Sequence, residues 1–254
     1  MTRLLRELKG HRKITALTAY DYPMAQILSK AGVDILLVGD SLGMVVLGYT
    51  STHFVTMEDM IRHTQAVMRG HSGLSLVVAD MPIGSCDSIE LALKNCRRMV
   101  DETGVRAVKI EGVPDICRAV VDSGIEVMGH TGLKPQTAER MKVKGKSKVE
   151  FDLIIQEAKD LQEAGCFSIV LEAVPSALGK EVTSVLSVPT IGIGAGPDCD
   201  GQILVVHDLI GMFTDFKPKF VKRYGDVGKM IGQSVAAFKE EVEQGIFPSP
   251  KESY

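Results

Sequence analysis

The 254-residue sequence lacks the features that mark membrane, secreted or nucleic-acid-binding proteins. No apolar run is long enough to span a bilayer, because Asp40 interrupts the richest candidate. The first nine residues contain neither a long apolar core nor a small-residue cleavage site, so we expect no signal peptide. Positive charge is not in excess, since 29 Lys and Arg face 32 Asp and Glu and leave a net charge of -3. This balance argues against nucleic acid as the main partner.

Cysteine is scarce and does not show the spacing of a metal or redox motif. The five cysteines form no C-x-x-C pair and are odd in number; they are Cys86, Cys96, Cys117, Cys166 and Cys199. Three of them have apolar neighbours, where cysteine usually behaves as a small hydrophobic residue. We therefore predict a reduced protein with a cytoplasmic location.

No linker and no low-complexity segment divides the chain. The hydrophobic content of 45% and the charged content of 24% are ordinary for a soluble globular protein, so disorder is not expected. The length is typical of a single β/α barrel. Residues 1–254 are therefore predicted to form a single domain.

Short apolar, β-branched runs recur along the chain and end on charged or polar side chains. The residues at six of these ends are Asp40, Asp80, Glu111, His130, Glu172 and His207. Continuous apolar runs are typical of strands that are buried on both faces, as in a parallel sheet covered by helices. If all the strands run the same way, their carboxyl ends meet at one rim, where a β/α barrel carries its chemistry.

Eight strands are predicted, and segments with helical periodicity lie between most of them. The predicted strands cover residues 14–18, 35–38, 76–79, 107–110, 126–128, 167–171, 190–193 and 203–206. Glycines that precede four of the strands suit the left-handed end of a helix; they are Gly32, Gly104, Gly124 and Gly165. Residues 226–245 form one more amphipathic pattern. The sequence thus predicts the α/β class, as a single (β/α)8 TIM barrel with an extra C-terminal helix.

Four acids would share the mouth of this barrel: Asp40, Asp80, Glu111 and Glu172. Two carboxylates about 4 Å apart repel by roughly 4 kcal/mol at an effective dielectric constant of 20. Such a group calls for a cation, a raised pKa, or both. Carboxylate oxygens without a His/Cys cluster of zinc spacing favour Mg²⁺. The alternative is that each acid caps the helix that follows it, which is as good an explanation for any one of them but a poor one for all four.

Lys109 lies two residues before Glu111, so both side chains point to the same side of a strand, into the barrel. A buried lysine without a partner is costly, and Lys109 should therefore face an acid or an anionic substrate. A plain ion pair with Glu111 or Asp80 is the competing interpretation, and the two are compatible.

Three weaker signals have ordinary structural alternatives. His130 and His207 end strands, but such histidines are more often structural than catalytic. The glycine-rich run at 192–196 is either a phosphate site or a place of tight backbone passage. The alternating lysines of 142–148 form either a solvated loop or a lid that meets an anionic substrate.

Several motifs occur in an order and spacing that resemble the ketopantoate hydroxymethyltransferase (3-methyl-2-oxobutanoate hydroxymethyltransferase) family. They are Thr18-Ala19-Tyr20-Asp21, Gly39-Asp40-Ser41-Leu42-Gly43-Met44, Val108-Lys109-Ile110-Glu111-Gly112, Gly129-His130-Thr131-Gly132-Leu133, Leu171-Glu172-Ala173-Val174-Pro175 and Gly192-Ile193-Gly194-Ala195-Gly196. The resemblance extends from about residue 14 to residue 248. Departures at 52–56 and 139–143 lie outside the positions that carry the chemistry.

The resemblance implies an enzyme of pantothenate biosynthesis. Such an enzyme transfers a hydroxymethyl group from 5,10-methylenetetrahydrofolate to 3-methyl-2-oxobutanoate, forming 2-dehydropantoate through an enolate that Mg²⁺ stabilises. The implied partners are these small molecules and further copies of the chain in a homodecamer. Two alternatives are a lyase or mutase that acts on phosphoenolpyruvate-like or 2-oxo acids, and a non-catalytic ligand-binding barrel.

Position by position, the resemblance also implies roles for individual residues. Glu172 would be the catalytic base. Metal binding would fall to Asp40, Asp80 and Glu111, the last on the metal or on its waters. The 2-oxo acid would be held by Asp40, Ser41, Asp80 and Lys109.

Overall fold

The computed structural model describes residues 2–138, 140–214 and 217–254. Internal contacts divide the chain into two compact units, one that ends at Leu204 and one that begins at Val205. That residues 1–254 form a single domain stays a prediction.

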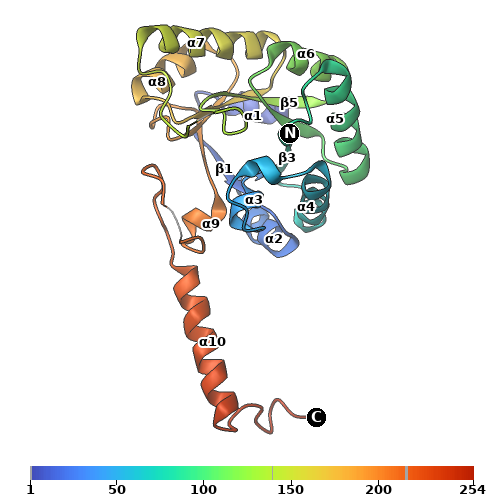
Figure 1. Ribbon diagram of the computed structural model, residues 1–254, viewed down its shortest axis with the longest axis vertical. Helices are drawn as coiled ribbons and strands as arrows, with labels where there is room; N and C mark the ends of the chain where they lie inside the picture. The colour runs from blue at the N-terminus through green and yellow to red at the C-terminus, as the bar shows by residue number, and fades with distance from the viewer. Residues whose placement is uncertain (1, 139, 215–216) are drawn as a thin grey trace. The chain divides into compact units, whose positions relative to one another are not determined.

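The first unit is a closed barrel of eight parallel strands in the order β1 to β8 (Figure 1). The strands are β1 (Ile14–Thr18), β2 (Ile35–Val38), β3 (Leu76–Asp80), β4 (Ala107–Glu111), β5 (Glu126–Gly132), β6 (Ser168–Glu172), β7 (Thr190–Ile193) and β8 (Gly201–Leu204). Pairing of β8 with β1 closes the barrel, with Ile14 opposite Gly201. The predicted fold class is confirmed.

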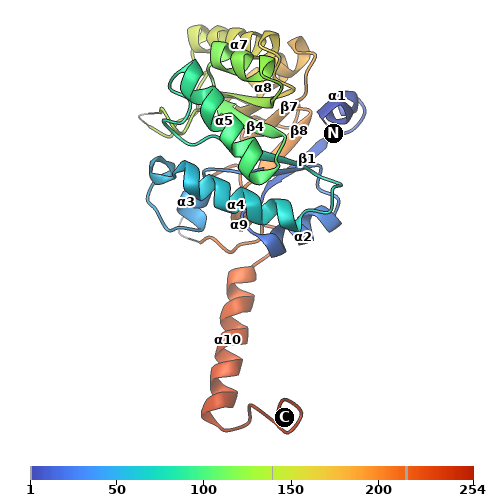
Figure 2. The same ribbon diagram turned by 90° about the vertical axis from the view of Figure 1, so that its right-hand side faces the viewer.

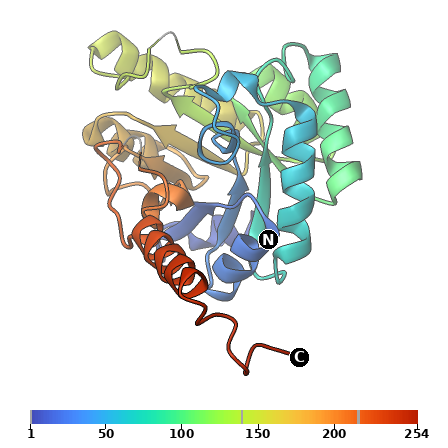
Figure 3. The same ribbon diagram turned by 60° about the horizontal axis from the view of Figure 1, so that its bottom comes forward.

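Helices surround the barrel, and several of them lie side by side on its outside (Figures 2 and 3). They are α1 (Thr2–Leu8), α2 (Tyr22–Lys30), α3 (Leu42–Val45), η1 (Thr52–Phe54), α4 (Met57–Gly70), α5 (Ile89–Thr103), α6 (Pro114–Asp122), α7 (Lys148–Glu163) and α8 (Ser176–Val185). The long helices bury one apolar face; α4, for example, buries Met60, Ile61 and Val67. All four glycines predicted at helix ends have positive φ, between 76° and 95°.

The barrel interior is apolar over most of its length and polar at the carboxyl ends of the strands. Alternate residues such as Ile14 and Ala16 on β1 and Ile35 and Leu37 on β2 fill it, together with Leu5 of α1. These side chains form the apolar core, and the polar residues that follow the strands lie at the carboxyl end of the barrel. This division places the candidate site at the carboxyl rim.

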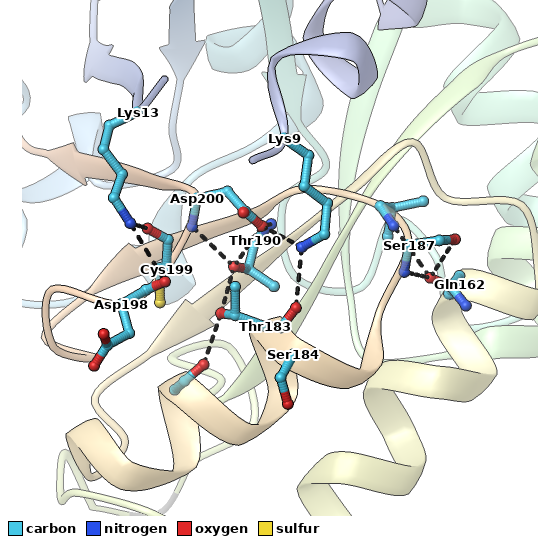
Figure 4. A network of polar contacts seen from close by, with 12 residues as sticks. Lys9, Lys13, Gln162, Thr183, Ser184, Ser187, Thr190, Asp198, Cys199 and Asp200 are labelled. Carbon is cyan, nitrogen blue, oxygen red and sulfur yellow. Dashed lines mark hydrogen bonds and ion pairs between the residues drawn. The ribbon is translucent and has the colours of Figure 1, made fainter. Parts of the chain in front are cut away.

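The amino ends of the strands carry a hydrogen-bonded network that involves Asp200, the residue before β8 (Figure 4). The backbone N–H and the hydroxyl of Thr190 donate to Asp200 Oδ2 at 2.9 and 3.1 Å, and Lys9 Nζ lies 2.6 Å from the same oxygen. Asp34 forms a similar arrangement before β2, where it accepts from Thr15 and Arg12. These polar contacts join residues at the starts of neighbouring strands.

The second unit contains α9 (Val206–Leu209) and α10 (Val227–Glu243). The predicted eighth strand was wrong at its end: it runs over 201–204, and Val206 and His207 belong to α9. The reason is that pairing with β1 begins at Gly201, directly after the anchored Asp200. The predicted C-terminal helix is confirmed as α10, although it buries none of its residues. Within the described residues, no helix is long and apolar enough to cross a membrane.

Candidate active site

Five adjacent strands, β2 to β6, deliver the polar residues of the mouth. Asp40 follows β2 by two residues, and Asp80 and Glu172 are the last residues of β3 and β6. Lys109 and Glu111 lie on β4, and the register pairs Lys109 with Asp80 and Glu111 with His130. The sequence prediction that the four acids and Lys109 meet at one rim is therefore consistent with the structure.

Lys109 is the central cation of this group. Its Nζ lies 2.7 Å from Asp80 Oδ1 and 3.9 Å from Glu111 Oε1. Burial lowers the pKa of Lys109, but the negative charges of Asp80 and Glu111 outweigh this effect and raise it above its ordinary value. Lys109 is thus a charged, buried ammonium group between two carboxylates, as its spacing from Glu111 predicts.

His130 links Glu111 to Glu172. Its Nδ1 lies 3.4 Å from Glu111 Oε1, and its Nε2 lies 3.4 Å from Glu172 Oε2. Burial and a neighbouring ammonium group lower the pKa of His130, but hydrogen bonding to Glu111 and Glu172 outweighs them and raises it to about 9. In the protonated form of the ring both nitrogens are donors. In the structure Lys109 Nζ also lies 3.5 Å from Nδ1, and Nε2 is buried without a hydrogen bond of good geometry. Sequence reasoning had favoured a structural histidine; the geometry places it between two acids of the mouth.

Asp40 and Asp80 are two buried acids that lie next to each other at the mouth. The backbone N–H of Asp40 donates to Asp80 Oδ2 at 3.4 Å, and both side chains are buried. Burial and the charge of Asp80 raise the pKa of Asp40 to about 7, and burial also raises the pKa of Asp80. Two such carboxylates are stabilised by a cation that lies between them.

The donor set fits Mg²⁺, which proteins usually hold through one or two carboxylates with water and substrate in the other positions. Asp40 and Asp80 supply that number of hard oxygens. Asp80 Oδ1 is buried and contacts Lys109 as an ion pair, but it has no hydrogen bond of good geometry. Across the described part of the chain, no three His, Cys, Asp or Glu side chains enclose a metal position.

The alternative explanation for the four acids, helix capping, fails. The residues that cap α3, α5, α6 and α8 at their amino ends are Ser41, Ser88, Val113 and Pro175. Each acid lies before the cap of the helix that follows its strand. The acids are therefore available for the chemistry of the mouth.

Two residues of the mouth escaped sequence reasoning. Tyr20 is buried, and its hydroxyl lies 2.8 Å from Ser41 Oγ, which fixes the orientation of Ser41. Gln136, in the turn after β5, donates from Nε2 to Asp40 Oδ2 at 3.0 Å. Neither residue type has a spacing signal, because both contacts join segments that are far apart in the chain.

The weaker sequence signals have ordinary structural explanations where the structure describes them. Gly192, Gly196 and the backbone of Ala195 pack closely against Cys199, Ser176 and Gly179, which favours tight backbone passage over a phosphate site. In the lysine-rich segment, Lys144 is tied by its backbone to Ala173, whereas Lys148 already belongs to α7. Glu139, in the departure at 139–143, lies outside the described residues.

The closed parallel barrel and a mouth of carboxylates around a buried lysine are the features of a β/α-barrel enzyme with an acidic site at the carboxyl rim. The family model for ketopantoate hydroxymethyltransferase matches residues 1–250. The chain belongs to this family, and it is a transferase.

Curated relatives agree with this assignment. A 3-methyl-2-oxobutanoate hydroxymethyltransferase of Dehalococcoides mccartyi is 52% identical over 258 residues, covering 98% of this chain and 92% of the relative. One from Thermoanaerobacter sp. is 51% identical over 261 residues, covering 100% and 95%. The names of these relatives support hydroxymethyl transfer to 3-methyl-2-oxobutanoate as the reaction of this chain.

Solved structures with similar folds are more distant in sequence. A 2,3-dimethylmalate lyase superposes with a TM-score of 0.62 at 17% identity, covering 100% of this chain and 91% of that chain. A phosphonopyruvate hydrolase complex with oxalate and Mg²⁺ gives a TM-score of 0.64 at 13% identity, covering 99% and 92%. At this identity the likeness shows the shared barrel alone.

Proposed function

We propose that the protein transfers the hydroxymethyl group from 5,10-methylenetetrahydrofolate to 3-methyl-2-oxobutanoate and so forms 2-dehydropantoate for pantothenate biosynthesis. Family membership supports the acceptor and the type of transfer. The observation that carries the rest is the continuous set of contacts from Asp40 through Asp80, Lys109 and Glu111 to His130 and Glu172.

Lys109, Asp40 and Asp80 would bind the 2-oxo acid together, the lysine directly and the two aspartates through Mg²⁺. Asp40 and Asp80 would hold Mg²⁺, with Glu111 contributing directly or through water. When bound, the ion supplies Lewis-acid stabilisation of the negative charge that develops on the substrate. Lys109 offers its ammonium group to the anionic substrate, and the hydroxyl of Ser41, oriented by Tyr20, offers a hydrogen bond.

Glu172 is proposed as the general base. It ends β6 at the mouth, and His130 Nε2 lies 3.4 Å from its Oε2, so a protonated ring would orient the carboxylate. Glu172 takes the proton from C3 of the 2-oxo acid, and the electron pair moves toward the keto oxygen. Water hydrolyses the two C–N bonds of the folate's methylene carbon, which releases tetrahydrofolate and leaves that carbon as formaldehyde. C3 then bonds to the formaldehyde carbon, and the formaldehyde oxygen takes up a proton and becomes the new hydroxyl group. A positioned base of this kind contributes about 10²–10⁴ in rate.

The direct test is formation of 2-dehydropantoate, measured by mass spectrometry, from the two substrates and Mg²⁺. We expect product in the complete mixture and none when the folate is omitted or the metal is chelated. Asp80→Asn should abolish product, because it removes one of the two proposed metal carboxylates. Turnover of the 2-oxo acid without folate would instead support a lyase, and equal product from wild type and Asp80→Asn would refute the assigned site.

The proposal includes a homo-oligomer, a decamer by resemblance, in a cytoplasmic setting. The support for an oligomer is that α10 exposes its apolar residues Met230, Ile231, Val235, Phe238 and Val242. Exposed apolar patches of this kind mark association surfaces. The support for a reducing compartment is that all five cysteines are free thiols. Light scattering of the full chain tests the stoichiometry; a monomer would contradict it.

A further inference from the structure

The turn after β5 reaches across the mouth, and Gln136 is the residue that makes the contacts. Its Nε2 donates to Asp40 Oδ2 at 3.0 Å and to the backbone oxygen of Met81 at 2.9 Å. Its backbone N–H donates to Glu111 Oε2 at 3.2 Å. A single residue thus bonds to the segments that follow β2 and β3 and to the end of β4.

The turn that carries Gln136 is itself fixed on several sides. The backbone N–H of Leu133 donates to the oxygen of Glu172 at 2.8 Å, and two N–H groups of the turn donate to the oxygen of Lys134. Lys134 Nζ lies 2.7 Å from Glu157 Oε1 of α7. His53 Nε2, on η1, lies 3.2 Å from the oxygen of Pro135. The turn that carries Gln136 is therefore fixed by hydrogen bonds and an ion pair, and it positions Gln136 over the mouth.

The chemistry of the amide suits a site that must attract a cation. Asp40 is buried beside Asp80, so its carboxylate needs a donor, but a Lys or Arg donor would add a positive charge that competes with the ion. The neutral amide of Gln136 donates a hydrogen bond to Asp40 Oδ2 without adding charge, and its second N–H donates to the backbone oxygen of Met81. Partners of this kind orient metal-binding carboxylates and tune their affinity.

We propose that Gln136 is a positioning residue: it assigns Asp40 Oδ2 to the turn, reserves Oδ1 for a divalent cation, and through its backbone sets the orientation of Glu111. The inference rests on the proposed function, because it assumes that Asp40 takes part in cation binding. It adds to that function a specific task for the turn after β5. Loss of the amide should weaken cation binding before it affects the fold.

The variant that isolates this task is Gln136→Met. Methionine keeps the length and bulk of glutamine and retains the backbone N–H to Glu111, but it cannot donate to Asp40. Gln136→Asn keeps the amide on a stem that is one methylene shorter, so it cannot reach Asp40 and Met81 together. Thr137→Val is the matched control, because Thr137 is the next residue of the same turn and its side chain is exposed.

Two readouts on the full chain decide the question. The first is Mg²⁺ affinity by calorimetry without substrate, and the second is exchange of the C3 proton of 3-methyl-2-oxobutanoate in D₂O with Mg²⁺ but without folate. We expect Gln136→Met and Gln136→Asn to weaken Mg²⁺ binding by about 10-fold to 100-fold. The C3 proton-exchange rate of these two variants should come closer to the wild-type rate at saturating Mg²⁺ than at limiting Mg²⁺. The melting temperature should remain close to that of Thr137→Val.

The outcomes separate the two proposals. If the wild type neither binds Mg²⁺ nor exchanges the proton, the proposed function fails and the inference falls with it. If the wild type does both, and Gln136→Met and Gln136→Asn match Thr137→Val within twofold in Mg²⁺ affinity, the proposed function stands and the role of Gln136 is overturned. A Mg²⁺ affinity that is unchanged while the melting temperature falls would also overturn it, because the role would then be structural.

Discussion

Lys109→Met tests how strongly the acids of the mouth depend on their buried cation. The substitution keeps an unbranched apolar stem of similar length and removes the charge that lies 2.7 Å from Asp80. Asp80 then remains buried beside Asp40 without its cation, and breaking a buried pair in this way costs about 3–5 kcal/mol. We therefore expect the free energy of unfolding in urea to fall by about that amount at pH 7 in EDTA.

The matched control is Lys134→Met. Lys134 forms an ion pair of the same length, 2.7 Å, with Glu157, but the two side chains are 29% and 23% exposed. Its loss should cost about 1 kcal/mol or less. Mg²⁺ stabilises every variant that binds it, by about 2.7 kcal/mol at a concentration 100 times the Kd. At one fixed Mg²⁺ concentration Lys109→Met should gain more than Lys134→Met, because it lacks the ammonium charge that competes with the ion beside Asp80. Equal losses in the two variants, or an absence of rescue, would refute the idea that burial and mutual repulsion dominate the energetics of the mouth.

Three further predictions follow from the same contacts. Glu172→Gln should retain Mg²⁺ and 2-oxo acid binding, measured by calorimetry, but lose about 10²–10⁴ in proton exchange at C3; wild-type exchange would show that another group is the base. Glu111 and Glu172 raise the pKa of His130 to about 9, against the effect of burial. The contribution of His130 to the free energy of unfolding is therefore complete below pH 6.5, the approximate pKa of histidine in the unfolded chain, and is lost as the pH rises through 9. NMR titration of the metal-free protein checks this value, and titration of His130 near 6.5 would contradict it. Asp200→Ala should lower the free energy of unfolding by about 3–5 kcal/mol, because it leaves Lys9 and the donors of Thr190 without their acceptor. The kcat/KM of the folded enzyme should stay unchanged. A large fall in kcat/KM of fully folded protein would show that the amino end of the barrel affects the mouth.

Much of the fold was readable from the sequence, because buried parallel strands are uniformly apolar and their ends are marked by charge. Asp80, Glu111 and Glu172 are the last residues of their strands, one position beyond the predicted ends at 79, 110 and 171. The eighth strand was misplaced because the run Ile203–Val206 is apolar throughout, whereas the actual start is set by the contact of Asp200 with Thr190 across the sheet. Local periodicity does not contain that contact.

The site was predictable to the same extent and for the same reason. Residues on strands, such as Lys109 and Glu111, are positioned by the period of two, so their common direction follows from spacing alone. Gln136 and Tyr20 reach the mouth through loops, and their partners Asp40 and Ser41 belong to a different part of the chain. The role of His130 depended on two acids from neighbouring strands, which only the register reveals.

The most direct measurement is the exchange of the C3 proton of 3-methyl-2-oxobutanoate for deuterium, followed by NMR with enzyme and without folate. Deprotonation by Glu172 next to a Mg²⁺ held by Asp40 and Asp80 predicts exchange that requires Mg²⁺, stops in EDTA and is lost in Glu172→Gln. Exchange that proceeds at one rate with and without the metal, or that is the same in wild type and Glu172→Gln, would contradict the assignment of this mouth as the place where the carbon acid is ionised.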